Sequence, residues 1–125
     1  MNEKSAGCIV RSEVMGEEFV LRAMKTATEF TAPLQEFIND HAWGGVWQRE
    51  GISRKIRSLI TVAALTSLKC PTELKGHIRG ALRNGCTVEE IRETILHCAV
   101  YAGVPACAEA FRAANEVIEE HQQNN

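Results

Sequence analysis

The amino-acid sequence predicts an all-α protein, and three observations lead to this fold class. Apolar residues recur at helical spacing, most clearly in RKIRSLITVAALTSL at residues 54–68. Residues that start or end helices, such as Pro71 and Gly103, separate the periodic segments. No stretch shows a period of two bounded by hairpin turns. We therefore expect a compact bundle of about six to seven helices, forming one domain over residues 1–125.

The first third of the chain is expected to form three short helices. Residues 4–30 contain two of them, separated near Gly16, because apolar residues recur there at helical spacing. A third helical piece covers residues 33–43, where Pro33 suits the first turn of a helix. The segment WQREGIS is then a loop, and it ends at Ser53, a residue type that favours the N-cap of the next helix.

Residues 54–68 are the strongest candidate for a core helix. Apolar side chains wrap so much of its circumference that we expect it to be central or to lie at a subunit interface. This is more apolar surface than a small bundle readily covers, so it also predicts a homo-oligomer. The apolar members are Ile56, Leu59, Ile60, Val62, Ala63, Leu65 and Leu68.

The next two helices have recognisable ends. Pro71 suits the first position of a helix that runs to Asn84, with Gly85 as its C-cap. Thr87 and Glu90 form a T-x-x-E capping box at the start of VEEIRETILHCAVYA.

The final helix is expected to follow directly. Gly103 ends the preceding helix, and Pro105 opens the last one, which runs to about Glu120. Residues 121–125, HQQNN, are entirely polar, so we expect them to form a frayed tail.

Composition and charge exclude several classes of protein. Lys and Arg number 14 against 16 Asp and Glu, so no basic surface indicates nucleic acid or an anionic membrane, and a small molecule or a protein is the expected partner. No apolar run approaches the roughly 18 residues that span a bilayer, and the start MNEKSAG is polar, so we expect a cytoplasmic protein. The five cysteines lack C-x-x-C spacing, which favours reduced packing thiols over disulfides or zinc ligands.

The segment KCPTELKGH at residues 69–77 holds the candidate chemistry. Glu73 and His77 stand at i and i+4 and share one helix face, where the carboxylate favours a protonated imidazole that donates a proton near neutral pH. The alternative is a surface ion pair of the kind that many helices carry, and spacing alone does not separate the two. Cys70 has Glu73, rather than a second cysteine, three residues further on.

Two long stretches resemble the γ-carboxymuconolactone decarboxylase family. They are HAWGGVWQREGISRKIRSLITVAALTSL and ELKGHIRGALRNGCTVEEIRETILHCAVYAGVPACAEAF. GCIVRSEVMG and ATEFTAPLQEF in the first third also fit, so the resemblance covers nearly the whole chain. More narrowly, the chain resembles the small stand-alone decarboxylases of the protocatechuate branch of the β-ketoadipate pathway.

The broader superfamily that the chain resembles includes alkylhydroperoxidase D-like proteins. In these proteins one helix carries C-x-x-C with a His four residues after the second Cys, and the preceding helix carries a Glu. On that pattern Cys70 falls on the first cysteine, Glu73 on the second, His77 on the histidine and Ser58 on the upstream glutamate. Two of the four positions depart from it. Cys70 cannot close a disulfide with Glu73, so peroxidase chemistry through a C-x-x-C couple is excluded at this helix.

The resemblance implies cofactor-free decarboxylation of 4-carboxymuconolactone, a dicarboxylate lactone, to the β-ketoadipate enol-lactone, by an alkylhydroperoxidase D-like homohexamer. His77 is then the proton donor and Glu73 orients it. No metal is expected, because His41, His77, His97 and His121 lack the ligand spacing of a metal centre, except for Glu73 with His77, which supply too few ligands.

Other side chains are candidates for substrate binding. Trp47 lies in the family's most recognisable loop, although Trp at helical spacing also suits core packing. His97 and Tyr101 stand at i and i+4. One alternative places both in a substrate pocket, and the other makes His97 a core residue whose hydrogen bonds are satisfied. Arg112 replaces the His of the decarboxylase pattern, which leaves room for a different substrate. Four arginines supply possible carboxylate forks, of which Arg57 lies in the segment shared with the family: Arg54, Arg57, Arg79 and Arg83.

Two competing functions remain open from the sequence. One is a thiol peroxidase or reductase on the same scaffold, in which Cys70 works with Cys86, Cys98 or Cys107 as a distant resolving cysteine. The other is a non-catalytic helical oligomer that binds a small acid or a partner protein.

Overall fold

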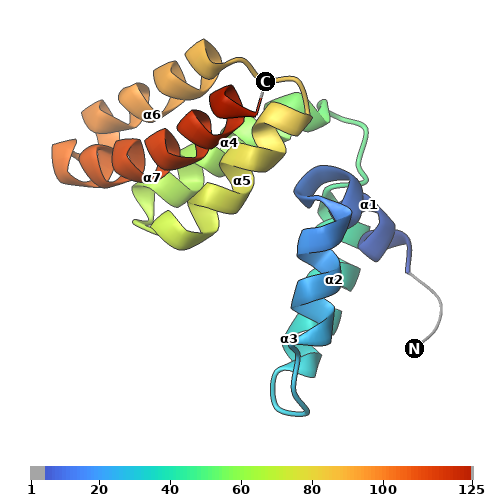
Figure 1. Cartoon of the computed structure of the whole chain (residues 1–125). Coiled ribbons are helices and arrows are strands. Elements are labelled where there is room, and N and C mark those ends of the chain that lie inside the picture. Colours follow the sequence, from blue (N-terminus) through green and yellow to red (C-terminus); the bar gives the residue numbers. More distant parts are fainter. Residues whose placement is uncertain (1–4, 125) are drawn as a thin grey trace. The chain divides into compact units, whose positions relative to one another are not determined.

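The computed structural model describes residues 5–124, which are helical apart from turns and one longer loop (Figure 1). Within that range there are seven α-helices and one π-helix, and no β-strand, so the predicted all-α class is confirmed. The chain separates into two compact units, which we call unit 1, ending at Ser53, and unit 2, beginning at Arg54. The single domain expected over residues 1–125 stays a prediction.

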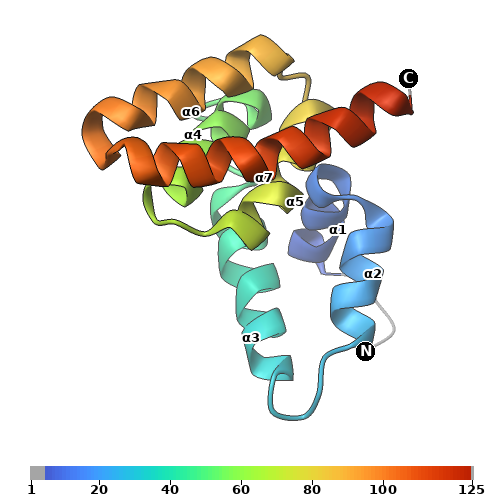
Figure 2. The same cartoon turned by 60° about the vertical axis from the view of Figure 1, so that its left-hand side comes forward.

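The described residues of unit 1 form four helical elements. They are α1 (Ala6–Met15), α2 (Glu17–Lys25), α3 (Ala32–Phe37) and the π-helix η1 (Ile38–Val46). The predicted break at Gly16 is confirmed, because this glycine has φ of 100°, a conformation that residues with a Cβ rarely adopt. The third predicted helix changes character at Ile38, where hydrogen bonding shifts to the wider π pattern. Figure 2 shows α2 and α3 joined at one end by a turn.

The contact between α1 and η1 is unusually close. A Cβ built on Gly7 would lie 1.7 Å from the backbone oxygen of Asn39, so only glycine fits at this crossing. Trp43 and Trp47 stack beside it with ring centroids 4.6 Å apart. Their partners in the buried cluster of unit 1 are Cys8, Val10, Val14, Met15 and Val20.

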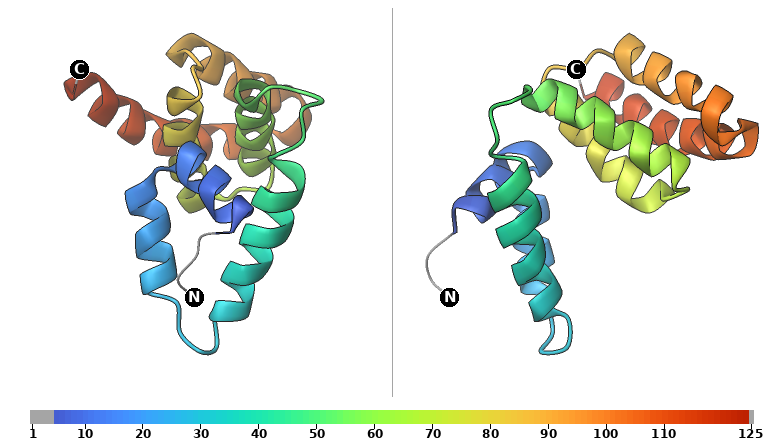
Figure 3. Two further views of the ribbon diagram at one scale, coloured as in Figure 1. Left: turned by 90° about the vertical axis from the view of Figure 1, so that its right-hand side faces the viewer. Right: turned by 180° about the vertical axis from the view of Figure 1, so that it is seen from behind.

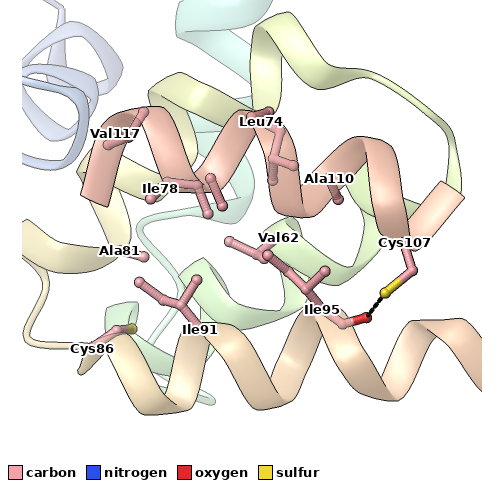
Figure 4. Packing of buried hydrophobic residues seen from close by; sticks show 12 residues of the cluster. Val62, Leu74, Ile78, Ala81, Cys86, Ile91, Ile95, Cys107, Ala110 and Val117 are labelled. Atoms are coloured by element: carbon pink, nitrogen blue, oxygen red, sulfur yellow. Dashed lines mark hydrogen bonds between the residues drawn. The ribbon is translucent and has the colours of Figure 1, made fainter. Parts of the chain in front are cut away.

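Unit 2 is a four-helix arrangement. Its helices are α4 (Arg54–Ser67), α5 (Pro71–Arg83), α6 (Val88–Ala102) and α7 (Val104–Gln123). Helix α4 packs against the other three, and Figure 3 shows it beside α5. Side chains from all four helices meet in one aliphatic cluster (Figure 4). Its fully buried members include Val62, Leu74, Ile78, Ile91 and Ile95.

The capping box at the start of α6 is confirmed. The Thr87 hydroxyl accepts a hydrogen bond from the Glu90 backbone N–H at 3.0 Å, and the Glu90 carboxylate accepts one from the Thr87 N–H at 2.9 Å. The end of α6 at Gly103 is also as predicted. Helix α5 differs slightly, because Asn84 is its C-cap and Gly85 follows with φ of 92°.

One expectation about unit 2 is wrong. Residues 121–123 of the predicted polar tail belong to α7, which continues to Gln123, and Asn125 lies outside the described residues. Helix α4 packs against the other three helices, so its predicted central position is confirmed within unit 2. Ile56 and Ile60 on it are 47% and 54% exposed, while its fully buried stripe carries two hydroxyl residues, Ser58 and Thr66. The interface alternative for α4 stays a prediction.

The cysteines agree with the expectation of packing thiols. All five cysteines are free thiols, and all but Cys70 are buried. Among the described residues, no helix combines the length and apolar character that crossing a membrane requires.

Candidate active site

The candidate site lies on the first two turns of α5. The chain reaches it through a tight turn after α4, in which Lys69 has φ of 58° and the Cys70 N–H donates to the Leu65 carbonyl oxygen at 3.0 Å. Cys70 is the N-cap and Pro71 the first residue of the helix. This turn fixes where α5 begins, and so sets the position of Glu73 and His77.

His77 and Glu73 have different surroundings. His77 is half-buried and its Nδ1 atom is enclosed by protein, whereas Glu73 is exposed in the first turn. The predicted placement on one helix is therefore correct. The two residues stand one helical turn apart on α5.

Polar groups are buried where α4 meets α5. Ser58 is fully buried, and its hydroxyl oxygen accepts a hydrogen bond from the Asn84 side-chain nitrogen at 2.9 Å. The Thr66 hydroxyl is also buried and makes no hydrogen bond with the described residues. Sequence analysis noted Ser58 only as a departure from a family pattern and missed Thr66 and Asn84. The available signal was the eight-residue spacing of Ser58 and Thr66, which places two hydroxyls on one helix face.

The predicted substrate-binding residues lie on several different elements. His97 and Tyr101 form a ring pair with centroids 5.2 Å apart, but both are exposed, with Tyr101 at 80%. The core alternative for His97 is therefore wrong within this chain. Trp47 is 9% exposed and stacks in the core of unit 1. Arg57, on α4, is half-buried with its Nε atom enclosed.

Two features bear on metal and thiol chemistry. Among the described residues, no group of three or more His, Cys, Asp or Glu is arranged to hold a metal ion. Burial raises the pKa of the Cys86 thiol and of the Cys107 thiol, which reduces the fraction of reactive thiolate at either position. Both were candidate resolving partners for Cys70, so these surroundings disfavour the thiol hypothesis.

Comparison with known proteins identifies the class of protein that this all-α chain represents. The model of the carboxymuconolactone decarboxylase family matches residues 32–116. A nitrosuccinic acid decarboxylase from Metarhizium robertsii is 49% identical over 112 residues, which cover 90% of this chain and 78% of the relative. A 4-carboxymuconolactone decarboxylase from Acinetobacter baylyi is 44% identical over 114 residues, covering 91% and 85%.

The chain belongs to the carboxymuconolactone decarboxylase family. Both named relatives are decarboxylases, and each matches most of its own length. These findings support an enzyme of the carbon–carbon lyase class that releases CO2.

Proposed function

We propose that this protein decarboxylates 4-carboxymuconolactone to the β-ketoadipate enol-lactone, within protocatechuate catabolism and without a cofactor. The observation that carries this proposal is the 44% identity to a 4-carboxymuconolactone decarboxylase across 91% of the chain. The retained His77 and Glu73 on α5 supply an acid and a carboxylate for the reaction.

The substrate's own structure explains why no cofactor is needed. The leaving carboxylate sits on a carbon conjugated through a double bond to the lactone carbonyl, so the released electron pair delocalises into a dienolate. The protein then has two tasks: to stabilise negative charge on the lactone oxygen, and to deliver a proton to the carbon next to that carbonyl.

His77 is the proposed proton donor. Its Nδ1 atom is enclosed by protein, so we assign the transferred proton to Nε2. Glu73 is exposed one turn earlier on α5, where its negative charge favours the protonated imidazole through space. In the proposed site, Arg57 meets a substrate carboxylate, while Trp47, His97 and Tyr101 are further proposed contacts in the assembled oligomer.

A second substrate has a specific observation in its favour. The nitrosuccinic acid decarboxylase is 49% identical to this chain. When CO2 leaves the carbon that bears a nitro group, the electron pair passes to the nitro oxygens as a nitronate, and a proton must then return to that carbon. The demands on the protein are therefore the same as for the lactone, and Arg112 at the expected histidine position permits a change of substrate.

The direct test mixes purified protein with freshly generated 4-carboxymuconolactone or with nitrosuccinic acid and follows CO2 release. His77→Ala is expected to slow the reaction by roughly 10²–10⁴-fold, the range for loss of a general acid. Glu73→Gln should slow it less, and it should move the activity optimum to lower pH because the imidazole loses a neighbouring negative charge. Cys70→Ser should leave the rate nearly unchanged.

The variants separate the enzyme hypotheses. Wild-type turnover in His77→Ala, with the helical circular dichroism spectrum retained, would remove the acid–base proposal. A Cys70→Ser variant that is the most damaged of the three would favour the thiol peroxidase or reductase instead. Binding of either acid without CO2 release would favour the non-catalytic binding protein.

We also propose that the protein is a cytoplasmic homo-oligomer, a hexamer by family resemblance. Large apolar side chains are exposed on unit 2, among them Ile60 at 54% and Val100 at 76%. Light scattering should return a multiple of the 13.8 kDa chain mass at micromolar concentration, and a monomer mass would exclude the oligomer.

A further inference from the structure

Helices α6 and α7 border a groove in unit 2 whose volume is about 320 Å³. Ile91 and Ile95 line it, and both are fully buried members of the aliphatic cluster (Figure 4). The floor of the groove is therefore part of the close-packed core, which holds its shape without a ligand. The apolar residues of the lining are Val88, Ile91, Ile95, Phe111, Ala114 and Ile118.

One cation lies at the edge of this groove. Arg92 lines it from α6, is exposed, and makes no hydrogen bond or ion pair with any other residue that the structure describes. Among the described residues that line the groove, none is Asp or Glu. Nearby carboxylates of α7 have other partners: Glu116 Oε2 lies 2.6 Å from Lys75 Nζ, and Glu119 Oε1 accepts a hydrogen bond from Asn115 Nδ2 at 2.8 Å.

The groove is separate from the proposed catalytic pair. All of its lining residues belong to α6 and α7, whereas Glu73 and His77 are on α5. Besides Arg92 and the apolar residues, the lining contains only two neutral amides, Asn115 and Gln122. A ligand in the groove is therefore distinct from a substrate bound at His77.

We propose that this groove binds a small acid that carries one carboxylate on an apolar body. The Arg92 guanidinium presents a planar fork of donors that matches one carboxylate, while the apolar floor and the partly exposed Phe111 ring cover the rest of the molecule. The volume lies at the lower end of the range for small-molecule sites, which fits a compact ligand. A second carboxylate would face apolar lining without a cation, at a cost in lost hydration. The groove therefore selects against dicarboxylates.

Both parts of the ligand are needed for binding. An exposed arginine alone attracts a carboxylate weakly, because water and salt screen the charge. The apolar floor alone gives no preference for an acid over an uncharged molecule of the same shape. An acid without an apolar body, and an apolar molecule without a charge, should each bind more weakly than a molecule that has both.

Methyl NMR on the full chain at low ionic strength tests the proposal, with benzoate as the probe. Benzoate should shift the methyl signals of Ile91, Ile95 and Ile118, and should leave the signal of Ile60, an exposed residue of α4, in place. Acetate and benzyl alcohol should each bind at least about tenfold more weakly than benzoate, the equivalent of one lost charge-assisted hydrogen bond or more. Arg92→Gln should weaken benzoate binding about tenfold for the same reason, and should leave benzyl alcohol binding unchanged.

Arg79→Gln is the matched control. It removes an exposed guanidinium of unit 2 that lies outside the groove and already has Glu120 as its partner, with Arg79 Nη2 3.4 Å from Glu120 Oε2. It should bind benzoate like the wild type, as should His77→Ala. An equal loss in Arg79→Gln would reduce the effect to non-specific charge attraction and overturn the proposal.

Three other results would also overturn it. They are benzyl alcohol binding as tightly as benzoate, an Ile60 signal that shifts as much as that of Ile118, and the absence of any shift at the groove methyls. If no groove methyl shifts and Arg92→Gln changes the mass measured by light scattering, a second copy of the chain covers the groove instead. Because the readout is binding, failure here is distinguishable from failure of the decarboxylase proposal.

Discussion

Unit 1 and unit 2 each have an interior, and the two interiors are stabilised by different kinds of contact. Unit 2 buries aliphatic side chains from four helices, with Leu74, Ile78 and Ile91 fully enclosed. Unit 1 relies on a glycine contact, a pair of stacked tryptophans and a buried arginine, and its helix α3 has no buried residue. Aliphatic packing tolerates small changes, but contacts between backbones do not. The difference predicts where each unit is sensitive to mutation.

Arg11 illustrates how polar the interior of unit 1 is. Its side chain is 6% exposed, and its Nη1 donates hydrogen bonds to the Gln35 Oε1 at 2.9 Å and the Asn39 Oδ1 at 3.0 Å. Burial lowers the pKa of the Arg11 guanidinium, which reflects the cost of removing a charge from water. The amide oxygens offset part of that cost and fix α1 against α3 and η1.

Unit 1 also leaves large apolar side chains uncovered. Phe30 is 92% exposed, and Leu34 and Phe37 on α3 are 58% and 61% exposed. Its own core is therefore small for its apolar content, whereas unit 2 encloses a larger cluster. Both tryptophans of the chain lie in unit 1, so tryptophan fluorescence reports unit 1 alone, while circular dichroism reports both units.

The largest expected effect is in unit 2, from Leu74→Ala. Leu74 is fully buried in the aliphatic cluster, so its truncation should lower the free energy of unfolding by about 2–5 kcal/mol through lost burial and the cavity left behind. Urea unfolding followed by circular dichroism measures the loss. Leu68→Ala makes the same chemical change at a side chain that is 70% exposed, and should cost far less. Equal losses in the two variants would mean that this cluster does not hold unit 2 together.

Gly7→Ala should produce the next largest effect, in unit 1. The new Cβ would meet the Asn39 backbone oxygen, so α1 and η1 must separate, at a cost of about 1–3 kcal/mol or more. Urea unfolding followed by tryptophan fluorescence should show the shift. Gly45→Ala is the matched control, because its Cβ would approach no closer than 3.8 Å to the Asp40 backbone oxygen.

Together these variants test how far the units are independent. Leu74→Ala should move the circular dichroism transition more than the fluorescence transition, and Gly7→Ala should do the reverse. A single cooperative domain over residues 1–125 would instead make both probes move together in both variants.

Local sequence signals predicted the helix ends well, and packing explains what they missed. Gly16, Gly103 and the Thr87–Glu90 box act through backbone geometry and neighbouring atoms, so the sequence alone contains the necessary information. The position where α7 ends is not set by local signals in the same way. Near its end α7 contacts α5 through Glu120 and Arg79, which lie 41 positions apart in the sequence. The contact at Gly7 likewise depends on a distant segment.

The candidate site likewise has features that the sequence predicted and features that depend on packing. Helical spacing correctly placed Glu73 and His77 on one helix, because that follows from the helix repeat. Their unequal burial, and the enclosed Thr66 hydroxyl, depend on how α4 packs against α5 and were not predictable from spacing. The exposure of His97 and Tyr101 also depends on the packing of α6 and not on its sequence pattern.

The smallest expected effect is a pH dependence confined to unit 2. The backbone N–H of Thr87, followed by Lys55, holds the pKa of the Glu90 carboxyl below its ordinary value. Lys55 Nζ lies 3.1 Å from Glu90 Oε2. A carboxyl whose pKa is lower in the folded state stabilises it above the unfolded pKa, about 4.3, and that stabilisation is lost as pH falls through the folded value. Glu90→Gln should therefore unfold at lower urea than the wild type at pH 7.

That difference in urea midpoint should shrink as the pH falls below about 4.3, because the wild-type carboxyl then becomes neutral as well. Circular dichroism should register it, while tryptophan fluorescence, which reports unit 1, should not. Glu89→Gln removes the same charge from the same turn without disturbing the capping box, so its midpoint should depend less on pH. A gap between Glu90→Gln and wild type that stays constant down to about pH 3, where the carboxyl is increasingly protonated, would show that Glu90 acts through the shape of its side chain and not through its charge.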